Sequence, residues 1–476
     1  MSDVVARLQA ALGDAVRLEE TDRAAAARDY WARSELEAWV GDGWSEGGTL
    51  AGTARLPRAV VAPTETAALA EAVRICRAHG VPMVPRGAGS GVCGGVLAGE
   101  EAVVLSTEAM AGLRAFEAHD LLATFGAGTL GGDAERAVAA RGCTIGNWPQ
   151  SIERSSVGGW VATRASGQYS TAYGNTEDLL YALEAVLPDG SVYRSRETPR
   201  AAAGPDLRQL LLGSEGTLGI VTEVTFSLRP QPEHAVRQAF HFPDFAVGVE
   251  AVRDVVVPGW RPPVVRLYDP RETRRHFAEA CPKGRAMLIF LHEGPRAHVE
   301  AEAGAVAALC RARGGEAADP AAVDAWFEHR NTVPSWRELF EQGLVVDTIE
   351  VATSWSRLAP LYAAVIDALG QVPNLVAASA HSSHAYRSGA NLYFTFAVAP
   401  SDRSAMLEAY DACWQAAMRA TVELGGGIAH HHGIGRVRRD WLLHELGPTG
   451  VRMLRAVKRA LDPDGLLNPG VLIPLG

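Results

Sequence analysis

The run Pro85–Gly95 has the composition of a phosphate-binding loop, because five of its residues are glycines. Apolar, strand-like segments flank it at Val81–Val84 and Ala102–Leu105. Glycine permits positive φ and close approach of the backbone, so successive N–H groups can point at an anion. The ligand expected here is a nucleotide diphosphate, and an ordinary glycine-rich turn is the alternative.

The spacing of Gly89, Gly91 and Gly94 formally matches the GxGxxG dinucleotide fingerprint, and Glu108 follows about 20 residues later as that fingerprint asks. A dinucleotide-binding unit, however, needs a helix between its two parallel strands, a crossover of roughly a dozen residues. The segment 95–101 is too short for that helix. We therefore predict strand, glycine loop and strand, with loop amides rather than a helix N-terminus holding the pyrophosphate.

A second glycine-rich region with few charges extends from Gly146 to Asn175. Its glycines, hydroxyls and amides permit close approach to a flat ligand while they donate hydrogen bonds. This combination suits the isoalloxazine ring and ribityl chain of a flavin. Tight turns inside a core are the alternative interpretation.

Three consecutive histidines, His430, His431 and His432, follow a glycine-rich segment. Their imidazoles could ligate a metal, transfer protons or bind an anion, or serve the structure. In a strand, His430 and His432 would share one face and His431 would oppose them. A metal site would need further ligands at suitable spacing, and none lies nearby in sequence. Proton transfer or anion binding is therefore favoured, and no metal is expected.

Two more residues of the second half of the chain could carry chemistry. Arg266 interrupts an apolar, strand-like run, and such an arginine is usually paired or binds an anion. Ala380–Phe396 indicates a loop entering a strand in which polar and apolar residues alternate around Tyr393. One face of that strand is expected to be polar, and Tyr393 could either move a proton or pack with a satisfied hydroxyl.

Short strands and amphipathic helices must position these residues. Before residue 232 the pattern predicts strands at Ala59–Ala62, Val81–Val84, Val103–Ser106, Leu122–Gly126, Leu183–Leu187 and Ile220–Leu228, and helices at Asp3–Leu12, Thr64–His79 and Gly132–Arg141. After it, the pattern predicts strands at Met287–Leu291 and Leu392–Val398 and helices at Pro360–Leu369, Asp402–Leu424 and Thr449–Leu461. The second set indicates a sheet covered by helices on one face.

The chain has 476 residues, which suggests two or three domains at roughly 150 residues per domain. A break at Pro230 and Pro232 separates the two patterns. We predict a leader at 1–56, which includes a Gly/Trp-rich stretch at Trp39–Gly52, then a domain at 57–231, a second at 232–425 and a C-terminal segment at 426–476.

Composition excludes several function classes. A formal net charge of −10 and the lack of a long Lys/Arg cluster argue against nucleic-acid binding. The six cysteines form no CxxC pair, which favours a reducing compartment over a disulfide framework. The sequence shows neither a signal peptide nor a long apolar run. A soluble, cytoplasmic protein is expected, with room for peripheral membrane contact.

Taken together, these motifs resemble the FAD-binding flavoproteins of the vanillyl-alcohol oxidase and p-cresol methylhydroxylase type. The resemblance covers about 57–230 and 425–476, and four segments carry it: Pro85–Gly95, Pro149–Ser151, Gly213–Gly219 and Leu467–Gly470. It implies an α+β fold in which a two-part FAD-binding domain contains an inserted α+β cap domain, with the C-terminal segment returning to the FAD site.

The resemblance also implies which residues bind FAD. They are mostly small or polar residues of the matched segments and of the glycine-rich region between them: Pro85, Arg86, Gly87, Ala88, Gly89, Ser90, Gly91, Pro149, Gln150, Ser151, Ser155, Gly158, Gly159, Ala162, Thr163, Ser166, Gly167, Glu215, Gly219, Ile220 and Asn468. Non-covalent binding is expected, because the glycine loop carries Ser90 and Cys93 but no histidine.

Within that superfamily the chain looks most like the alkyldihydroxyacetonephosphate synthase family, on three runs: Ser156–Gly167, Tyr173–Asn175 and His430–Gly433. That family exchanges the acyl group of acyl-dihydroxyacetone phosphate for a fatty alcohol through a flavin N5 adduct, without net redox change, in ether lipid synthesis. The resemblance implies that Tyr393, His431 and His432 handle protons, while Arg266 assists the anionic leaving group or phosphate.

A second branch, the FAD-linked 2-hydroxy acid dehydrogenases, is similar in the glycine loop and the tail. Its members oxidise acids such as D-lactate, glycolate or D-2-hydroxyglutarate and use a metal on a His-rich loop. Their His-x-x-Gly-Asp-Gly-Asn-Leu-His pattern retains His384 here but has Tyr393 at its last histidine, and their Gly-Glu-His-Gly-Ile-Gly pattern has His431 at the glutamate. Two metal ligands are missing, which favours the synthase.

A flavin-binding protein without catalysis is the least favoured alternative, because polar groups are costly to bury without a use. The expected partner is a small-molecule or lipid-phosphate substrate, with a homodimer as a further expectation. The C-terminus Ile473–Gly476 is not a peroxisomal address, which agrees with a cytoplasmic location.

Overall fold

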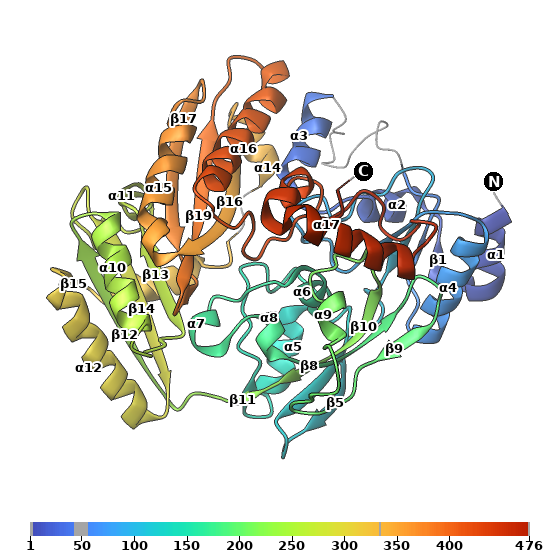
Figure 1. The fold of residues 1–476 in the computed structure, drawn as a ribbon, viewed down its shortest axis with the longest axis horizontal. Helices are drawn as coiled ribbons and strands as arrows, with labels where there is room; N and C mark the ends of the chain where they lie inside the picture. Colours follow the sequence, from blue (N-terminus) through green and yellow to red (C-terminus); the bar gives the residue numbers. More distant parts are fainter. Residues whose placement is uncertain (1–2, 42–55, 333–334, 475–476) are drawn as a thin grey trace. The chain divides into compact units, whose positions relative to one another are not determined.

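The computed structural model describes residues 3–41, 56–332 and 335–474 (Figure 1). These residues form two compact units. Unit 1 contains the chain up to Ser166, then Asn175–Pro230, and then the chain from His431 onward; unit 2 contains Gly167–Gly174 and Gln231–His430. The chain thus leaves unit 1 twice and returns to it twice. The predicted Trp39–Gly52 stretch lies outside the described residues from residue 42 on.

The first sheet of unit 1 has the order β1 (Val16–Arg17), β2 (Ala59–Val61), β4 (Val103–Ser106) and β3 (Met83–Arg86). Strands β2 and β3 are both parallel to β4. Helix α4 (Thr66–Ala78) connects β2 to β3 and buries Leu69 and Val73. No helix stands between β3 and β4, so the predicted order of strand, glycine loop and strand is confirmed.

Strand β3 begins two residues later than the sequence predicts. The Val81 N–H donates to the carbonyl of Cys76 at 3.0 Å and so still belongs to the end of α4. Pro82, which follows, has no N–H to give to a strand partner. The apolar character of Val81 and Pro82 therefore reflects burial against α4 and not strand pairing.

The second sheet of unit 1 is antiparallel and contains the strands β5 (Leu113–Glu117), β6 (Leu122–Gly126), β10 (Ile220–Ser227), β8 (Leu180–Val186) and β9 (Val192–Arg194), in that order. A two-stranded ribbon joins β7 (Cys143–Thr144) to β11 (Arg229–Pro230). Phe125, Trp160 and Phe226 fill the core under this sheet. The apolar alternation of β10 explains why its bounds were predictable.

The remaining helices of unit 1 are α1 (Asp3–Leu12), α2 (Glu20–Ala26), α3 (Ala32–Val40), α5 (Gly131–Ala139), α6 (Val157–Thr163), α8 (Thr176–Leu179), α9 (Arg208–Leu211) and α17 (Leu442–Leu461). Helix α17 is interrupted at Gly447, whose φ is +65°, and Pro448 follows. The predicted helix at Thr449–Leu461 is the part after this interruption.

Unit 2 is built on an eight-stranded antiparallel sheet. Its strands are β15 (Glu316–Ala318), β12 (His234–Phe242), β14 (Ala286–Gly294), β13 (Val264–Tyr268), β17 (Leu375–Ser382), β19 (Gly389–Val398) and β16 (Val345–Ser354), in that order, with β18 (Ala385–Tyr386) paired to β19. Four helices cover one face: α10 (Phe245–Val256), α12 (Arg296–Ala312), α15 (Trp355–Gly370) and α16 (Met406–Glu423) (Figure 1).

The sequence predicts helices on that face only, and this part of the prediction is wrong. Helix α13 (Ala321–His329) packs its Val323 and Trp326 against Met287 and Ile289, on the opposite face. Three further helices of unit 2 are α7 (Ser170–Tyr173), α11 (Pro270–His276) and α14 (Trp336–Glu341). The alternating burial of β14, apolar on both faces, is what a strand between two layers requires.

The predicted loop at 380–391 is also wrong. His381 and Ser382 end β17, and Ala385–Tyr386 form β18, which turns back to pair with β19. Alanine and serine dominate this stretch and give little strand signal on their own. The strand forms because β17 lies between β13 and β19, a pairing that local sequence does not encode.

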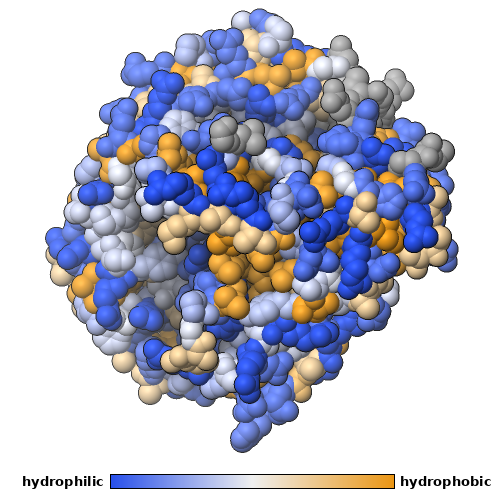
Figure 2. Space-filling view, turned by 45° about the vertical axis from the view of Figure 1, so that its right-hand side comes forward, coloured by the Kyte–Doolittle hydropathy of each residue, from blue (hydrophilic) through white to orange (hydrophobic). Residues whose placement is uncertain are grey.

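The surface mixes hydrophilic residues with smaller hydrophobic areas (Figure 2). All six cysteines are buried free thiols, in agreement with the absence of a disulfide framework. Helix α17 exposes apolar side chains at Leu443, Leu446 and Met453, the last with 67% of its surface accessible. Among the described residues, no helix combines the length and the apolar character needed to cross a membrane.

Candidate functional site

A row of polar side chains crosses four strands of unit 2. In the strand registers, Tyr268 of β13 lies opposite His381 of β17, His381 opposite Tyr393 of β19, and Tyr393 opposite Glu350 of β16. Directly opposed residues share a face of the sheet. Because Phe394 alternates with Tyr393 and packs in the core, the row lies on the face away from α15 and α16. The predicted polar face is confirmed.

Arg266 of β13 projects into this row. Its Nε donates to the Tyr268 hydroxyl at 2.8 Å, and its Nη2 lies 2.9 Å from Nε2 of His381. The guanidinium also lies 5.4 Å from the ring of Trp326. Among the described residues, no carboxylate pairs with Arg266 and Nη1 has no hydrogen-bond partner. A half-buried guanidinium without a counter-ion is a candidate binding group for an anionic ligand.

Glu272 of α11 anchors the row from beneath. Its Oε2 lies 2.8 Å from Nδ1 of His381, and its Oε1 accepts from Arg275 at 3.0 Å and Thr395 at 3.2 Å. Burial alone would raise the pKa of this carboxyl, but His381 and Arg275 outweigh it and lower the pKa to about 2. Glu272 is therefore ionised, and His381 faces a fixed negative charge.

Tyr393 stacks its ring on the imidazole of His381, with centroids 4.8 Å apart and planes 20° apart. Its hydroxyl donates to Thr348 Oγ1 at 3.1 Å. Burial raises the pKa of Tyr393 to about 12, so the phenol stays protonated at neutral pH. The structure thus brings the predicted residues Arg266 and Tyr393 together through His381.

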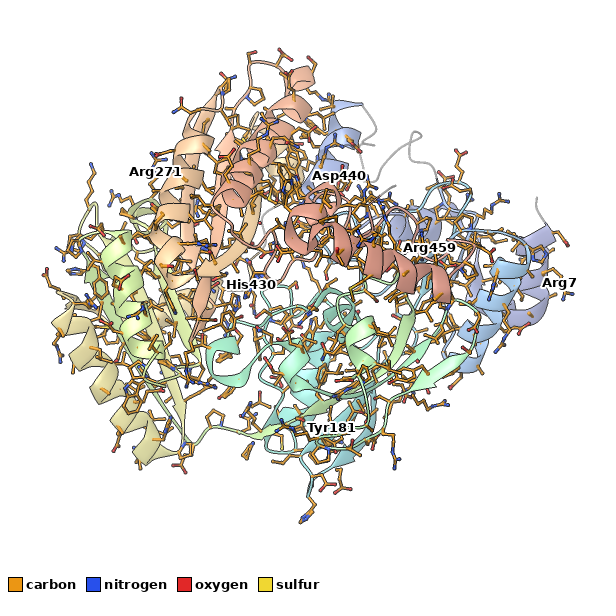
Figure 3. The ribbon with its side chains drawn as sticks, in the orientation of Figure 1. Arg7, Tyr181, Arg271, His430, Asp440 and Arg459 are labelled. Atoms are coloured by element: carbon orange, nitrogen blue, oxygen red, sulfur yellow. The ribbon has the colours of Figure 1, made fainter. Side chains whose placement is uncertain are left out.

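A second polar cluster in unit 2 surrounds His430 (Figure 3). The Tyr386 hydroxyl lies 2.7 Å from His430 Nε2, and the backbone N–H of His430 donates to Glu350. The imidazole of His384 lies 4.8 Å from that of His430 and bonds to Ser170 at 2.6 Å. A tyrosine hydroxyl hydrogen-bonded to an imidazole is a suitable arrangement for proton transfer.

Aromatic rings and a second guanidinium lie near Arg266. Arg330 stands 5.5 Å from the Trp326 ring and 4.6 Å from the Phe327 ring, and it donates to the Tyr169 hydroxyl at 2.9 Å. Trp326 therefore contacts two guanidinium groups, one from β13 and one after α13. This arrangement concentrates positive charge on the polar face.

The glycine loop of unit 1 is packed so closely that side chains would not fit. A Cβ on Gly87 would lie 2.4 Å from Ser156 Oγ, and a Cβ on Gly94, whose φ is +72°, would lie 2.6 Å from Trp31. A Cβ on Gly435 would lie 2.1 Å from the carbonyl oxygen of Cys93. The loop is thus enclosed by the leader, by α6 and by the C-terminal segment, all within unit 1.

Glu215 and Asn468 join the predicted FAD segments to one another. The carboxylate of Glu215 accepts from the backbone N–H groups of Ile434 and Gly435 at 2.6 and 2.7 Å. The Asn468 amide donates to the carbonyls of Gly95 at 3.1 Å and Glu215 at 2.7 Å. Burial raises the pKa of Glu215 to about 7, although both backbone bonds oppose the shift.

The histidine run divides between the units. His430 ends unit 2, while His431 and His432 begin the last part of unit 1 with their rings 4.6 Å apart and nearly perpendicular. The run is irregular backbone, so the strand alternation considered from the sequence is wrong. Gly433, with φ at +83°, turns the chain directly after it, which a strand could not accommodate.

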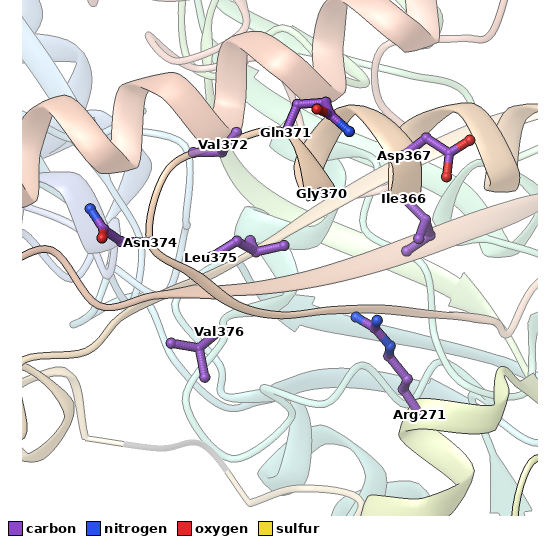
Figure 4. Close-up of a pocket in the computed structure, with 9 residues that line it drawn as sticks. All are labelled: Arg271, Ile366, Asp367, Gly370, Gln371, Val372, Asn374, Leu375 and Val376. Carbon is purple, nitrogen blue, oxygen red and sulfur yellow. The ribbon is translucent and has the colours of Figure 1, made fainter.

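A pocket of about 440 Å³ lies elsewhere in unit 2, between the end of α15 and the start of β17 (Figure 4). Arg271, Asp367 and Gln371 are among its lining residues. The Arg271 guanidinium donates to the carbonyl of Ala378 at 3.0 Å. None of the residues predicted to bind or react lines this pocket.

Comparison with known proteins assigns both units to flavoprotein domains. Residues 57–196 match the family described as "FAD binding domain", and residues 231–472 match "FAD linked oxidases, C-terminal domain". An uncharacterized FAD-linked oxidoreductase, YgcU of Escherichia coli K12, is 32% identical over 438 residues, which is 89% of this chain and 90% of that protein.

Two further relatives carry functional names. The alkyldihydroxyacetonephosphate synthase of Caenorhabditis elegans is 30% identical, over 88% of this chain and 76% of its own. The glycolate oxidase subunit GlcD of Bacillus subtilis is 28% identical, over 87% of this chain and 88% of its own.

The fold matches solved structures of the same superfamily. An alkyldihydroxyacetonephosphate synthase structure superposes with a TM-score of 0.80 at 23% identity, covering 98% of this chain and 84% of the other. Substrate-bound p-cresol methylhydroxylase gives a TM-score of 0.75 at 20% identity, covering 98% and 95%. The predicted p-cresol methylhydroxylase-type fold is confirmed.

The residues of unit 1 fit FAD. Asn468 Oδ1, Asn147 Oδ1 and Arg86 Nε are buried without a hydrogen-bond partner among the described residues, so acceptors and a donor await a polar ligand. The close-packed glycines leave backbone amides accessible along the loop. A flavin with its pyrophosphate offers both donors and acceptors to such groups. The FAD expected from the sequence is confirmed as the cofactor of this family.

Sequence reasoning missed Glu272, His381, Tyr386 and Glu350. Each belongs to a network whose members lie on different strands or helices, such as His381 and Glu272, which are 109 residues apart. The only available signal was the alternation around Tyr393, which marks a polar face but not what fills it. The individual roles predicted for Tyr393, His431, His432 and Arg266 stay predictions.

Proposed function

Because the chain belongs to the FAD-linked oxidase family and is an FAD-dependent flavoenzyme, we propose that it exchanges the acyl group of acyl-dihydroxyacetone phosphate for a fatty alcohol. The reaction would serve ether lipid synthesis. The observation that carries this proposal is Arg266, a guanidinium without a carboxylate partner placed beside two groups that can hold protons, His381 and Tyr393. A phosphorylated substrate needs such a cation next to such groups.

The roles divide between the units. When bound to unit 1, FAD supplies an electrophilic and redox-active ring. Arg266 binds the phosphate, Tyr393 hydrogen-bonds to the reacting oxygen, and His431 and His432 accept and return protons. The FAD is held without a covalent bond, which is supported by the engagement of the buried Cys93 thiol with Arg438 at 3.1 Å.

Oxidation of a 2-hydroxy acid such as D-lactate, glycolate or D-2-hydroxyglutarate is the second candidate. The similarity to a glycolate oxidase subunit supports it. One structural observation also favours it, since His381 beside Arg266 could receive the hydroxyl proton of an acid whose carboxylate binds the guanidinium. This oxidation would leave reduced flavin and need an electron acceptor, whereas the exchange would not.

The deciding experiment is an anaerobic incubation of the FAD-saturated enzyme with acyl-dihydroxyacetone phosphate and a radiolabelled fatty alcohol. We expect label to enter an alkali-stable ether product with no electron acceptor present. Arg266→Gln should lose this exchange, while Arg296→Gln, which alters an exposed helical ion pair, should retain it. Lasting reduction of the flavin by a hydroxy acid, with no exchange, would replace the proposal by the second candidate.

We further propose a cytoplasmic enzyme that touches membranes peripherally. Helix α17 supports this because Leu443, Leu446 and Met453 are exposed on it together with Arg452 and Arg459. Binding to anionic but not zwitterionic vesicles, weakened by Met453→Glu, is the expected result in a flotation assay. A homodimer is a separate proposal, which sedimentation velocity would test.

A further inference from the structure

The imidazole of His381 is held rigidly on the polar face of unit 2. Tyr393 stacks on one side of it at 4.8 Å, and Tyr268 lies 5.4 Å away with its ring inclined by 38°. Only 12% of the His381 side chain is accessible to solvent. The ring therefore cannot rotate freely, and the atoms facing its two nitrogens decide its protonation.

The partner of Nδ1 fixes the tautomer. Glu272 is ionised and its Oε2 lies 2.8 Å from Nδ1, so Nδ1 must carry a hydrogen. In the neutral ring the lone pair then belongs to Nε2. A carboxylate that orients an imidazole in this way also stabilises the imidazolium after a proton is taken up.

The lone pair on Nε2 is occupied by Arg266. Nη2 of the guanidinium, which is always protonated, donates to it at 2.9 Å. Burial, together with the charge of Arg266, lowers the pKa of His381 although Glu272 opposes the shift. Without a ligand, His381 is neutral and its basic nitrogen is masked.

We propose that His381 is the proton acceptor of this site and that Arg266 masks its Nε2 until an anionic substrate binds the guanidinium. The inference rests on the anionic substrate of the proposed function. An oxyanion forms charge-assisted hydrogen bonds to an arginine, and these are stronger than the bond to a neutral imidazole. Once Nη2–H turns to the anion, Nε2 can take a proton from the substrate, and the electron pair of the broken bond stays on the substrate.

Neighbouring titratable groups agree with this assignment. Helix α11 contributes Glu272, Arg275 and His276, β13 contributes Arg266 and Tyr268, and β19 contributes Tyr393. Burial first, and then Arg275, lowers the pKa of His276 to about 4, so His276 stays neutral at physiological pH. The two tyrosines are neutral as well, since burial raises both pKa values. His381 is thus the group whose charge an arriving anion would change.

The test is calorimetric binding of sulfate to the FAD-saturated enzyme, because sulfate does not itself titrate near neutral pH. Comparing buffers of different ionisation enthalpy near pH 6.5, the unperturbed histidine pKa, gives the protons taken up per sulfate. We expect uptake approaching one proton in the wild type and in the surface control Arg296→Gln. In His381→Gln sulfate should still bind, with uptake near zero, and in Arg266→Gln both should be lost.

Sulfate binding without proton uptake in the wild type would overturn the inference, and so would equal uptake in His381→Gln or the absence of sulfate binding. The wild-type measurement stands alone if a variant fails to fold. The acyl-exchange assay separates this inference from the proposed function. Exchange without proton uptake would remove only the masking by Arg266, whereas uptake without exchange would remove only the proposed reaction.

Discussion

The two units use polar side chains in different ways. In unit 1 they bind backbone: Glu215 bonds to two N–H groups and Asn468 to two carbonyls, so they hold loops in place. In unit 2 they bind one another, as in the chain from Glu272 through His381 to Arg266. Unit 1 therefore presents a fixed backbone cradle, while unit 2 presents groups whose protons and hydrogen bonds can rearrange.

The largest effect should come from a methyl group in the cradle. Gly435 has φ at +54°, and a Cβ there would lie 2.1 Å from the carbonyl oxygen of Cys93, so Gly435→Ala must push the C-terminal segment off the glycine loop. We expect FAD affinity to fall more than about 100-fold, because backbone strain and a displaced loop combine. The flavin retained after desalting measures this.

Gly465→Ala is the matched control, because Gly465 has φ at +65° but no atom within 4 Å of the added Cβ. It should carry only the cost of the left-handed conformation, about 1–2 kcal/mol of unfolding free energy. Equal FAD loss in the two variants would show that the close approach at Gly435 does not matter, and the description of unit 1 as a close-packed cradle would fail.

The next effect concerns pH and again separates the units. Burial raises the pKa of Glu215 from 4.5 to about 7 and that of Asp29 from 3.8 to about 7. The folded state then binds more protons than the unfolded state in this range, so the free energy of unfolding should fall as pH rises toward 7 and stay level above it. The buried Glu272 of unit 2, whose pKa is lowered, has the opposite sign.

Urea unfolding of the FAD-saturated protein at several pH values checks this sign. Glu215→Gln should flatten the decline by a few kcal/mol, at about 1.4 kcal/mol per pKa unit of the removed shift. Glu153→Gln, which alters an exposed carboxylate of the same unit, should keep the wild-type slope. A Glu215→Gln slope identical to that of the wild type would mean that Glu215 ionises normally in the folded protein.

The same difference between the units explains what the sequence could reveal. The order of strand, glycine loop and strand was predictable, because Gly89 and Gly94 adopt positive φ for local reasons. The network of unit 2 was not, because Arg266, Glu272 and His381 meet only through the pairing of β13 with β17 and the packing of α11. Even the strand bounds failed where small residues, such as Ala378 and Ser379, depend on neighbouring strands.

A smaller effect tests the role predicted for Tyr393. Tyr393→Phe keeps the stacked ring but removes the hydroxyl, so FAD should stay bound while turnover falls by more than about tenfold. Thr348→Val removes only the partner of that hydroxyl and should cost less than about threefold. Turnover in the acyl-exchange assay, normalised to bound flavin, gives both values. Full activity of Tyr393→Phe would transfer the role to the other hydroxyl of unit 2, that of Tyr386.

The smallest effect should come from charge at a distance. Arg330 and Arg266 both stand over the Trp326 ring, at 5.5 and 5.4 Å, so Arg330 adds positive potential to the anion site without needing to touch the substrate. Arg330→Gln should raise the KM for the anionic substrate about threefold at low salt and leave kcat unchanged. Because an exposed, long-range field is screened, the difference should shrink as ionic strength rises.

Arg237→Gln is the matched control for Arg330→Gln, because Arg237 also lies against Phe327, at 5.7 Å, but pairs with the exposed Asp324. Its KM should change by less than about twofold. If Arg330→Gln instead lowered kcat, or if its KM effect persisted at high salt, Arg330 would have to bind the substrate directly. The polar face of unit 2 would then hold two anion-binding arginines, and a doubly charged phosphate would suit it better than a carboxylate.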